Sequence, residues 1–123
     1  MRVKTTSFVV FFVFLFLVSA NYGLAVVDCG TIESENLELT DCKFNESNRT
    51  ITGKIKNKSD YEFGRVHIFF ALYNEEGENI GTVGQANDYL GPKETWPFPT
   101  ISINNDTVKK VKPAKLIEVK LSK

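Results

Sequence analysis

The chain has 123 residues, with 15 Lys and Arg against 15 Asp and Glu and a single His, so its formal net charge at pH 7 is zero. This balance argues against nucleic acid as the main partner, because phosphate binding needs a strong basic excess. A chain of this length builds one domain with one core and leaves no room for a large enclosed active site.

Residues 1–25 have the three-part pattern of a secretory signal peptide. Arg2 and Lys4 precede eleven unbroken apolar residues, and small and polar residues follow. Eleven residues in a helix span about 17 Å, which is short of the roughly 30 Å that a transmembrane helix must cross. We therefore expect cleavage, after Ala25 by preference or else after Ala20. The alternative is an uncleaved anchor, the only case in which we expect membrane association.

Removal of residues 1–25 leaves one predicted domain, 26–123, with 98 residues, 13 Lys and Arg and 15 Asp and Glu. With or without cleavage, this domain lies outside the cytoplasm. The sequence thus predicts a protein that is secreted or belongs to the cell envelope.

Two cysteines, Cys29 and Cys42, belong to the predicted domain. An even pair in an oxidising environment is most simply a disulfide. A closed four-ligand zinc site would have to recruit carboxylates, because the chain has a single His. We expect a Cys29–Cys42 disulfide that ties the N-terminal segment to the first strand, and we expect neither a metal nor a cofactor.

Four N-x-[ST] tripeptides fall in predicted loops or turns, where exposed backbone suits a glycan. The same residue types are also the ordinary material of turns, and both interpretations stay open. The possible acceptors are Asn45, Asn48, Asn57 and Asn105.

Short segments of alternating apolar and polar residues follow in chain order, with no sustained helical period. The segment 37–44 is a first predicted strand, with Leu37, Leu39 and Asp41 on one side. The segment 50–57 is the next, with Ile51, Gly53 and Ile55 facing inward.

The segment 65–73 predicts a central strand, because it is apolar on both faces. Its inward face carries Val66, Ile68, Phe70 and Leu72. A hairpin turn around Gly77 leads to a strand at 80–86, which Gly81 and Gly84 mark as an edge or a bulge.

Pro97 and Pro99 each lack a ladder donor, so the segment 95–99 belongs at a sheet edge. The segment 101–111 is ambiguous, with a turn at 104–106. The last predicted strand, 114–121, has Ile117, Val119 and Leu121 facing inward. Six or seven short strands with turns at this spacing predict an all-β, immunoglobulin-like β-sandwich, with a small open barrel as the rival.

Several stretches resemble the FxLYD domain family. They are Gly53 to Ser59, the segment Phe70-Ala71-Leu72-Tyr73-Asn74 with Gly77 after it, and Leu90 to Phe98. The similarity covers about residues 51–101, and Asn74 stands where the family has Asp, a replacement that keeps the turn-forming hydrogen bonds. The resemblance implies an exported immunoglobulin-like domain without established catalytic activity, and it implies no catalytic residue.

Catalysis has little support in the residues themselves. A Ser-His-Asp arrangement needs a histidine base, and the single His67 lies within a predicted strand. No pair of carboxylates stands out by its spacing. We therefore expect a protein that is not an enzyme, with a small secreted hydrolase or isomerase of unrecognised type as the alternative.

Two sets of residues are candidates for contact with a partner. His67, Phe69 and Tyr73 project from the less buried face of the predicted central strand, where a partner can reach them if loops leave the face open. Lysines near the C-terminus form a possible patch for an anionic polymer, with edge protection as the competing interpretation. These lysines are Lys109, Lys110, Lys112 and Lys115.

The expected function is that of an exported, non-catalytic immunoglobulin-like module that binds a protein or an envelope polymer.

Overall fold

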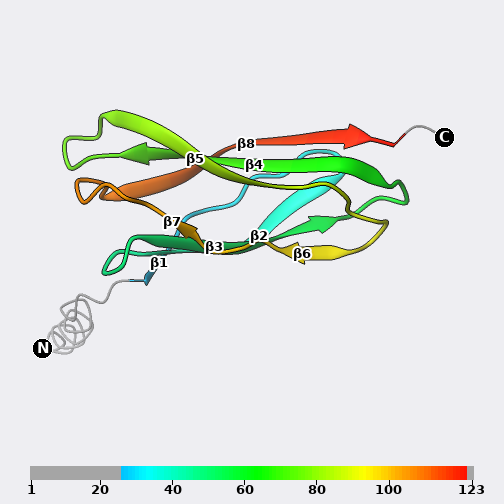
Figure 1. Cartoon of the computed structure of the whole chain (residues 1–123), viewed down its shortest axis with the longest axis horizontal. Coiled ribbons are helices and arrows are strands. Elements are labelled where there is room, and N and C mark those ends of the chain that lie inside the picture. Colours follow the sequence, from blue (N-terminus) through cyan, green and yellow to red (C-terminus); the bar gives the residue numbers. More distant parts are fainter. Residues whose placement is uncertain (1–25, 122–123) are drawn as a thin grey trace, which may run out of the picture.

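Two antiparallel sheets face each other in the computed structural model, which describes residues 26–121 (Figure 1). Sheet A contains β1 (Val26–Asp28), β2 (Leu37–Asn45), β3 (Thr50–Asn57), β6 (Thr95–Pro97) and β7 (Ile101–Ser102). Its order is β1-β2-β3-β6, and β7 also pairs with β3. Sheet B has the order β5-β4-β8, with β5 (Asn79–Asn87), β4 (Phe63–Tyr73) and β8 (Lys110–Lys120).

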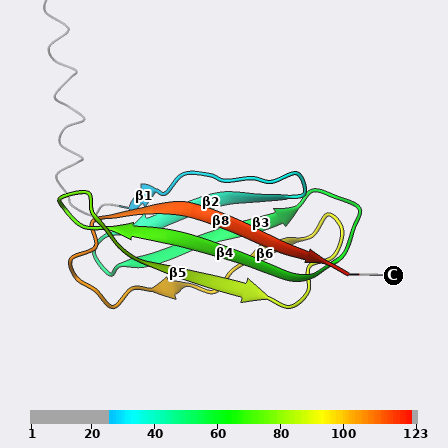
Figure 2. The same cartoon turned by 90° about the horizontal axis from the view of Figure 1, so that it is seen from above.

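The chain crosses between the sheets three times, after β3, after β5 and after β7. Seen from above, β8, β4 and β5 lie side by side over the strands of sheet A (Figure 2). The predicted all-β sandwich is thus confirmed. The described residues form eight strands, whereas six or seven were predicted. The difference arises because the sequence did not indicate β1 and left β7 ambiguous.

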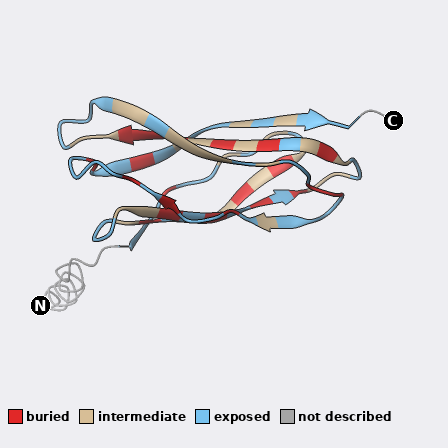
Figure 3. Cartoon of the chain, in the orientation of Figure 1, coloured by how far each residue is buried: buried red, intermediate tan, exposed pale blue. Residues whose placement is uncertain are grey.

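The core lies between the sheets, and buried positions alternate with exposed or half-buried ones along β2, β3 and most of β4 (Figure 3). The prediction for β3 is confirmed, since Ile51, Gly53 and Ile55 are buried and the alternate residues Thr52, Lys54 and Lys56 are exposed. The central position of β4 is also confirmed, with β5 on one side and β8 on the other. Its inward side chains are buried as predicted: Val66, Ile68, Phe70 and Leu72.

A β-bulge changes the facing of β2 halfway along the strand. Asp41 and Cys42 together oppose the single residue Gly53, and Asp41 has a φ of 55°. Such a bulge shifts the alternation by one residue. The inward position expected for Asp41 is therefore wrong: Asp41 is exposed, and Cys42 and Phe44 are buried instead.

A second bulge has the same effect in β8. Lys115 pairs with Phe69 and Pro113 pairs with Phe70, so Ala114 is an additional residue in β8. Beyond it the alternation is reversed, and the inward facing predicted for Ile117, Val119 and Leu121 is wrong. These three side chains are exposed, with Ile117 at 37% and Val119 at 53%.

The predicted disulfide is present. Cys29 and Cys42 are bonded across a sequence separation of 13, with their Cα atoms 5.4 Å apart. Both residues are buried, and the bond fixes the segment that follows β1 to the bulge of β2. This bond suits an oxidising compartment outside the cytoplasm.

The structure corrects the expectation for one glycan acceptor. Asn57 has no exposed surface. Its amide group donates hydrogen bonds of 2.8 Å to the backbone carbonyls of Tyr61 and Gly91. A glycan on this nitrogen has no space in the folded domain, so Asn57 is not a suitable acceptor.

The other possible acceptors lie in exposed turns or at a strand end. In each tripeptide the Ser or Thr hydroxyl donates to the Asn Oδ1 atom, at 2.6 to 3.0 Å. Glycosylation at these positions stays a prediction; they are Asn45, Asn48 and Asn105.

The predicted signal peptide, residues 1–25, lies outside the described residues. Among residues 26–121, no helix has the length and apolar character that a membrane span requires.

Candidate functional site: the outer face of sheet B

The side of sheet B that points away from the core carries both candidate sets. On β4 the outward residues are His67, Phe69 and Tyr73, all partly exposed, with Ala71 between the two aromatic positions. These residues point outward because side chains alternate along a strand, and the residues between them pack in the core.

The register of β8 against β4 places a lysine beside each aromatic position. Tyr73 pairs with Lys110 and Phe69 pairs with Lys115. Lys112 pairs with Ala71, midway between them, and its Nζ atom lies 5.9 Å from the centroid of the Tyr73 ring. The two candidate sets therefore form one surface, which we call the basic-aromatic face: His67, Phe69, Tyr73, Lys110, Lys112 and Lys115.

Lys109 does not belong to this face. It precedes β8, and its backbone N–H donates to the carbonyl of Tyr73 at 2.8 Å. Its side chain lines a different hollow, beside Glu75, Glu76 and Asp106. The fourth lysine of the predicted patch is thus surrounded by acids rather than by lysines.

A glycine lets two rings lie flat on the sheet. The rings of His67 and Phe69 are stacked, with centroids 4.0 Å apart and planes 21° apart. Gly84 of β5 pairs with Phe69, and a Cβ atom there would lie 2.5 Å from the backbone oxygen of Ile68 and 3.2 Å from the Phe69 ring. A side chain at Gly84 would displace the stacked pair.

Two shallow hollows follow each other along the basic-aromatic face. The Phe69 hollow has about 220 Å³ and is lined by Phe69, Thr82, Ala114 and Lys115. The Tyr73 hollow has about 230 Å³ and is lined by Tyr73, Gly77, Lys110 and Lys112. Each hollow combines an aromatic ring with at least one lysine.

Exposed aliphatic side chains continue the face beyond His67. Ile117 pairs with His67, and Val119 pairs with Arg65. Both aliphatic residues face outward because the bulge at Ala114 reversed the alternation of β8. The predicted facing missed this part of the surface: Pro113 is a sequence signal for a strand edge or a bulge, but which residue is the additional one becomes known only from the pairing with β4.

The charges on the face are of one sign. Arg65 is paired with Asp88 at 3.3 Å, whereas the ion pairs of the described residues include none that involves Lys110, Lys112 or Lys115. The hairpin tip between β4 and β5 carries the opposite charge, with Glu75, Glu76 and Glu78 next to the Tyr73 hollow. The acidic tip therefore limits the positive region at this end.

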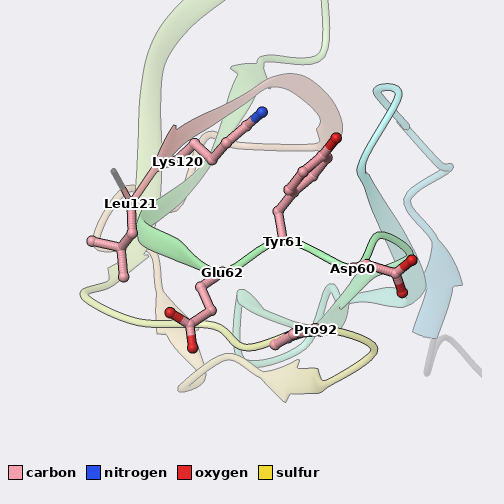
Figure 4. Close-up of a pocket in the computed structure, with 6 residues that line it drawn as sticks. All are labelled: Asp60, Tyr61, Glu62, Pro92, Lys120 and Leu121. Carbon is pink, nitrogen blue, oxygen red and sulfur yellow. The ribbon is translucent and has the colours of Figure 1, made fainter. Parts of the chain in front are cut away.

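A different hollow, of about 290 Å³, lies at the end of the sandwich (Figure 4). Tyr61 and Lys120 extend side by side, and the Nζ atom of Lys120 is 3.9 Å from the centroid of the Tyr61 ring. Glu62 accepts a hydrogen bond of 3.0 Å from the hydroxyl of Tyr89, which raises the pKa of Tyr89 above its ordinary value of 10.0. Lys120 already occupies one side of the exposed Tyr61 ring. The hollow has a mixed charge, because Asp60 and Glu62 line it together with Lys120.

Two chemical features of residues 26–121 bear on the expectations for catalysis and metal binding. The hydrogen bonds of these residues include none between the His67 imidazole and a carboxylate or hydroxyl. No cluster of three or more His, Cys, Asp or Glu side chains in this range could hold a metal ion.

Comparison with known proteins gives a limited similarity to a solved structure. No family model and no curated protein matches the sequence. A crystal structure of a DUF1425 family member from Shewanella sp. pv-4 is similar, with a TM-score of 0.47 and 14% sequence identity. The similar region covers 80% of this chain and 98% of that one.

Proposed function

We propose that the chain is an exported, non-catalytic binding module that contacts a partner in the cell envelope through the basic-aromatic face. The observation that carries the proposal is the register of β4 and β8, which places Lys110 and Lys115 beside Tyr73 and Phe69. Partly exposed aromatic side chains beside exposed lysines suit contact with a partner, because the rings offer apolar surface and the lysines offer charge.

Export is supported by two independent features of the chain. Residues 1–25 have the pattern of a signal peptide. The Cys29–Cys42 bond suits an oxidising compartment. Membership of the FxLYD family, which the sequence resembles, would be consistent with both.

A binding role suits the shape of the face better than catalysis does. Its two hollows are shallow, and the single His is stacked on Phe69 rather than hydrogen-bonded to an acid. A general base needs a partner that orients it and a reacting group that is held within hydrogen-bond reach.

Binding to native envelopes tests the proposal. The purified protein is mixed with envelopes of its own source organism, and the bound fraction is measured by sedimentation. We expect the Phe69→Ser, Lys112→Gln, Lys115→Gln triple variant to lose most of the binding. The matched control changes lysines on the outer side of sheet A, Lys54→Gln with Lys56→Gln, and should bind like the unchanged protein.

Thermal unfolding of each variant shows whether the fold is kept. A folded triple variant that binds envelopes as well as the unchanged protein would refute the proposed role of this face.

A further inference from the structure

The basic-aromatic face repeats one chemical unit. In the Phe69 hollow an aromatic ring lies beside Lys115, and in the Tyr73 hollow an aromatic ring lies beside Lys110 and Lys112. Phe69 and Tyr73 are four residues apart on β4, so their backbone positions are about 13 Å apart along the strand. A ligand that uses both hollows must be extended, and a polymer with a repeating unit suits the repetition of ring and lysine.

The chemistry of the unit indicates what each repeat contains. An aromatic ring offers a flat apolar surface, which suits the C–H face of a sugar ring. The neighbouring ammonium group suits a negative charge on the same sugar. We infer that the ligand is an acidic polysaccharide, which places one uronic acid against each aromatic ring with its carboxylate at the adjacent lysine. This inference rests on the proposed function of the face.

A chain with several charges fits better than a single anion. Each lysine is exposed, and a single exposed ion pair contributes little to affinity. Contacts along one polymer add up, because once one unit is bound the next acts at a high effective concentration.

An anionic bilayer fits the same lysines less well. A bilayer is a plane, and it would bring Glu75, Glu76 and Glu78 of the hairpin tip close to its own negative charge. A single polysaccharide chain can follow β8 and end before the tip.

Pairing of a partner strand with the free edge of β8 is also disfavoured. Pro113 lacks an N–H donor and the bulge at Ala114 interrupts the ladder. Glu118 is held by Asn36, whose Nδ2 atom donates at 2.8 Å, so the segment after β1 lies against this edge. The outward surface is therefore the available one.

Calorimetric titration of the full protein with hexagalacturonic acid tests the inference. We expect binding that weakens as salt is raised, because the contacts are ionic. Monomeric galacturonic acid and an uncharged glucose hexamer should bind at least about tenfold more weakly. Lys112→Gln with Lys115→Gln should lower the affinity about tenfold, whereas Lys54→Gln with Lys56→Gln on sheet A should leave it unchanged.

A variant of the hairpin tip should strengthen binding, whereas the lysine variants weaken it. Replacement of Glu75, Glu76 and Glu78 by Gln removes negative charge beside the Tyr73 hollow and should tighten binding of the hexamer. Nonspecific attraction would instead strengthen equally when three acids away from the face are replaced by Gln, because either change raises the net charge by three.

The inference fails if hexagalacturonic acid does not bind, if the sheet A lysines matter as much as those on β8, or if vesicles containing anionic lipid bind more tightly than the hexamer. The envelope assay separates this failure from that of the proposed function. If the triple variant loses envelope binding but the hexamer does not bind, the face is functional and its ligand belongs to another class.

Discussion

Asn57 connects three segments of the chain through one buried side chain. Its Nδ2 atom donates to the carbonyls of Tyr61 and Gly91, and its Oδ1 atom accepts from the backbone N–H of Ser59. Its backbone N–H donates to Glu94. One asparagine thus holds the β3–β4 and β5–β6 connections together at the end of the sandwich.

Asn57→Ala should destabilise the protein strongly. The change leaves the Gly91 carbonyl without its buried partner and removes the bond to Tyr61, for an expected loss of about 3 kcal/mol in the free energy of unfolding. Chemical denaturation measures this loss. Asn48→Ala in an exposed turn is the control and should cost less than about 1 kcal/mol; equal effects of the two changes would contradict the role given to Asn57.

Gly84→Ala tests the support of the stacked rings. Its Cβ atom would lie 2.5 Å from the backbone oxygen of Ile68, so the strand must shift, at an expected cost of about 1–3 kcal/mol. The His67 ring resonances in an NMR spectrum should move, because the Phe69 ring no longer lies against them. Thr82→Ala, at an exposed position of the same strand, should leave both the stability and these resonances nearly unchanged.

The residues of the basic-aromatic face are among those that the sequence singles out, but Lys109 lies outside the face, and the arrangement of the others could not be predicted. Alternation along 65–73 is enough to place Phe69 and Tyr73 on one face, because the other face is continuously apolar. The alternation that places Ile51 and Ile55 inward also places Asn57 inward. The burial of Asn57 could therefore have been predicted, although its N-x-[ST] tripeptide suggested an exposed glycan acceptor. That Lys115 lies beside Phe69 depends on the pairing of strands distant in sequence, which no local pattern contains.

At the scale of the elements, the bulges decide which side chains are exposed. Predictions for β3 and β4 were correct because these strands keep their alternation along the positions concerned. They were wrong for Asp41 and for the second half of β8, where one additional residue reverses the facing. A bulge depends on the partner strand, so alternation within a single segment does not reveal it.

Cysteine labelling tests the reversal in β8. Val111 and Ile117 are six residues apart, so an uninterrupted strand would put them on the same face. The bulge separates them, leaving Val111 4% exposed and Ile117 37% exposed. We expect Ile117→Cys to react rapidly with a water-soluble thiol reagent and Val111→Cys to react slowly. Similar rates at the two positions would contradict the bulge.

At the scale of the whole molecule, the disulfide fixes the segment between β1 and β2 against the sandwich. This segment contributes Ile32 to the edge of the core and holds Glu118 of β8 through Asn36. By fixing this segment, the disulfide also helps to hold Asn36 against the free edge of β8.

Removal of the disulfide should destabilise the protein without unfolding it. Replacement of Cys29 and Cys42 by Ala releases a loop with a sequence separation of 13, for an expected loss of about 3 kcal/mol in the free energy of unfolding. Denaturation by guanidinium measures the loss, and the unchanged protein in reductant should approach the variant. An unchanged midpoint would show that the bond contributes nothing to stability.

The two sheets present different outer surfaces. That of sheet A carries Lys54, which is paired with Asp41 at 3.4 Å, whereas that of sheet B carries lysines beside aromatic rings.

NMR mapping of backbone amides during titration with envelope polymer from the source organism shows which outer surface binds. We expect the resonances that shift to belong to β4, β5 and β8, with the largest changes around Phe69, Lys112 and Lys115. Shifts confined to the outer side of sheet A, or to the hollow around Tyr61 and Glu62, would refute binding at the basic-aromatic face.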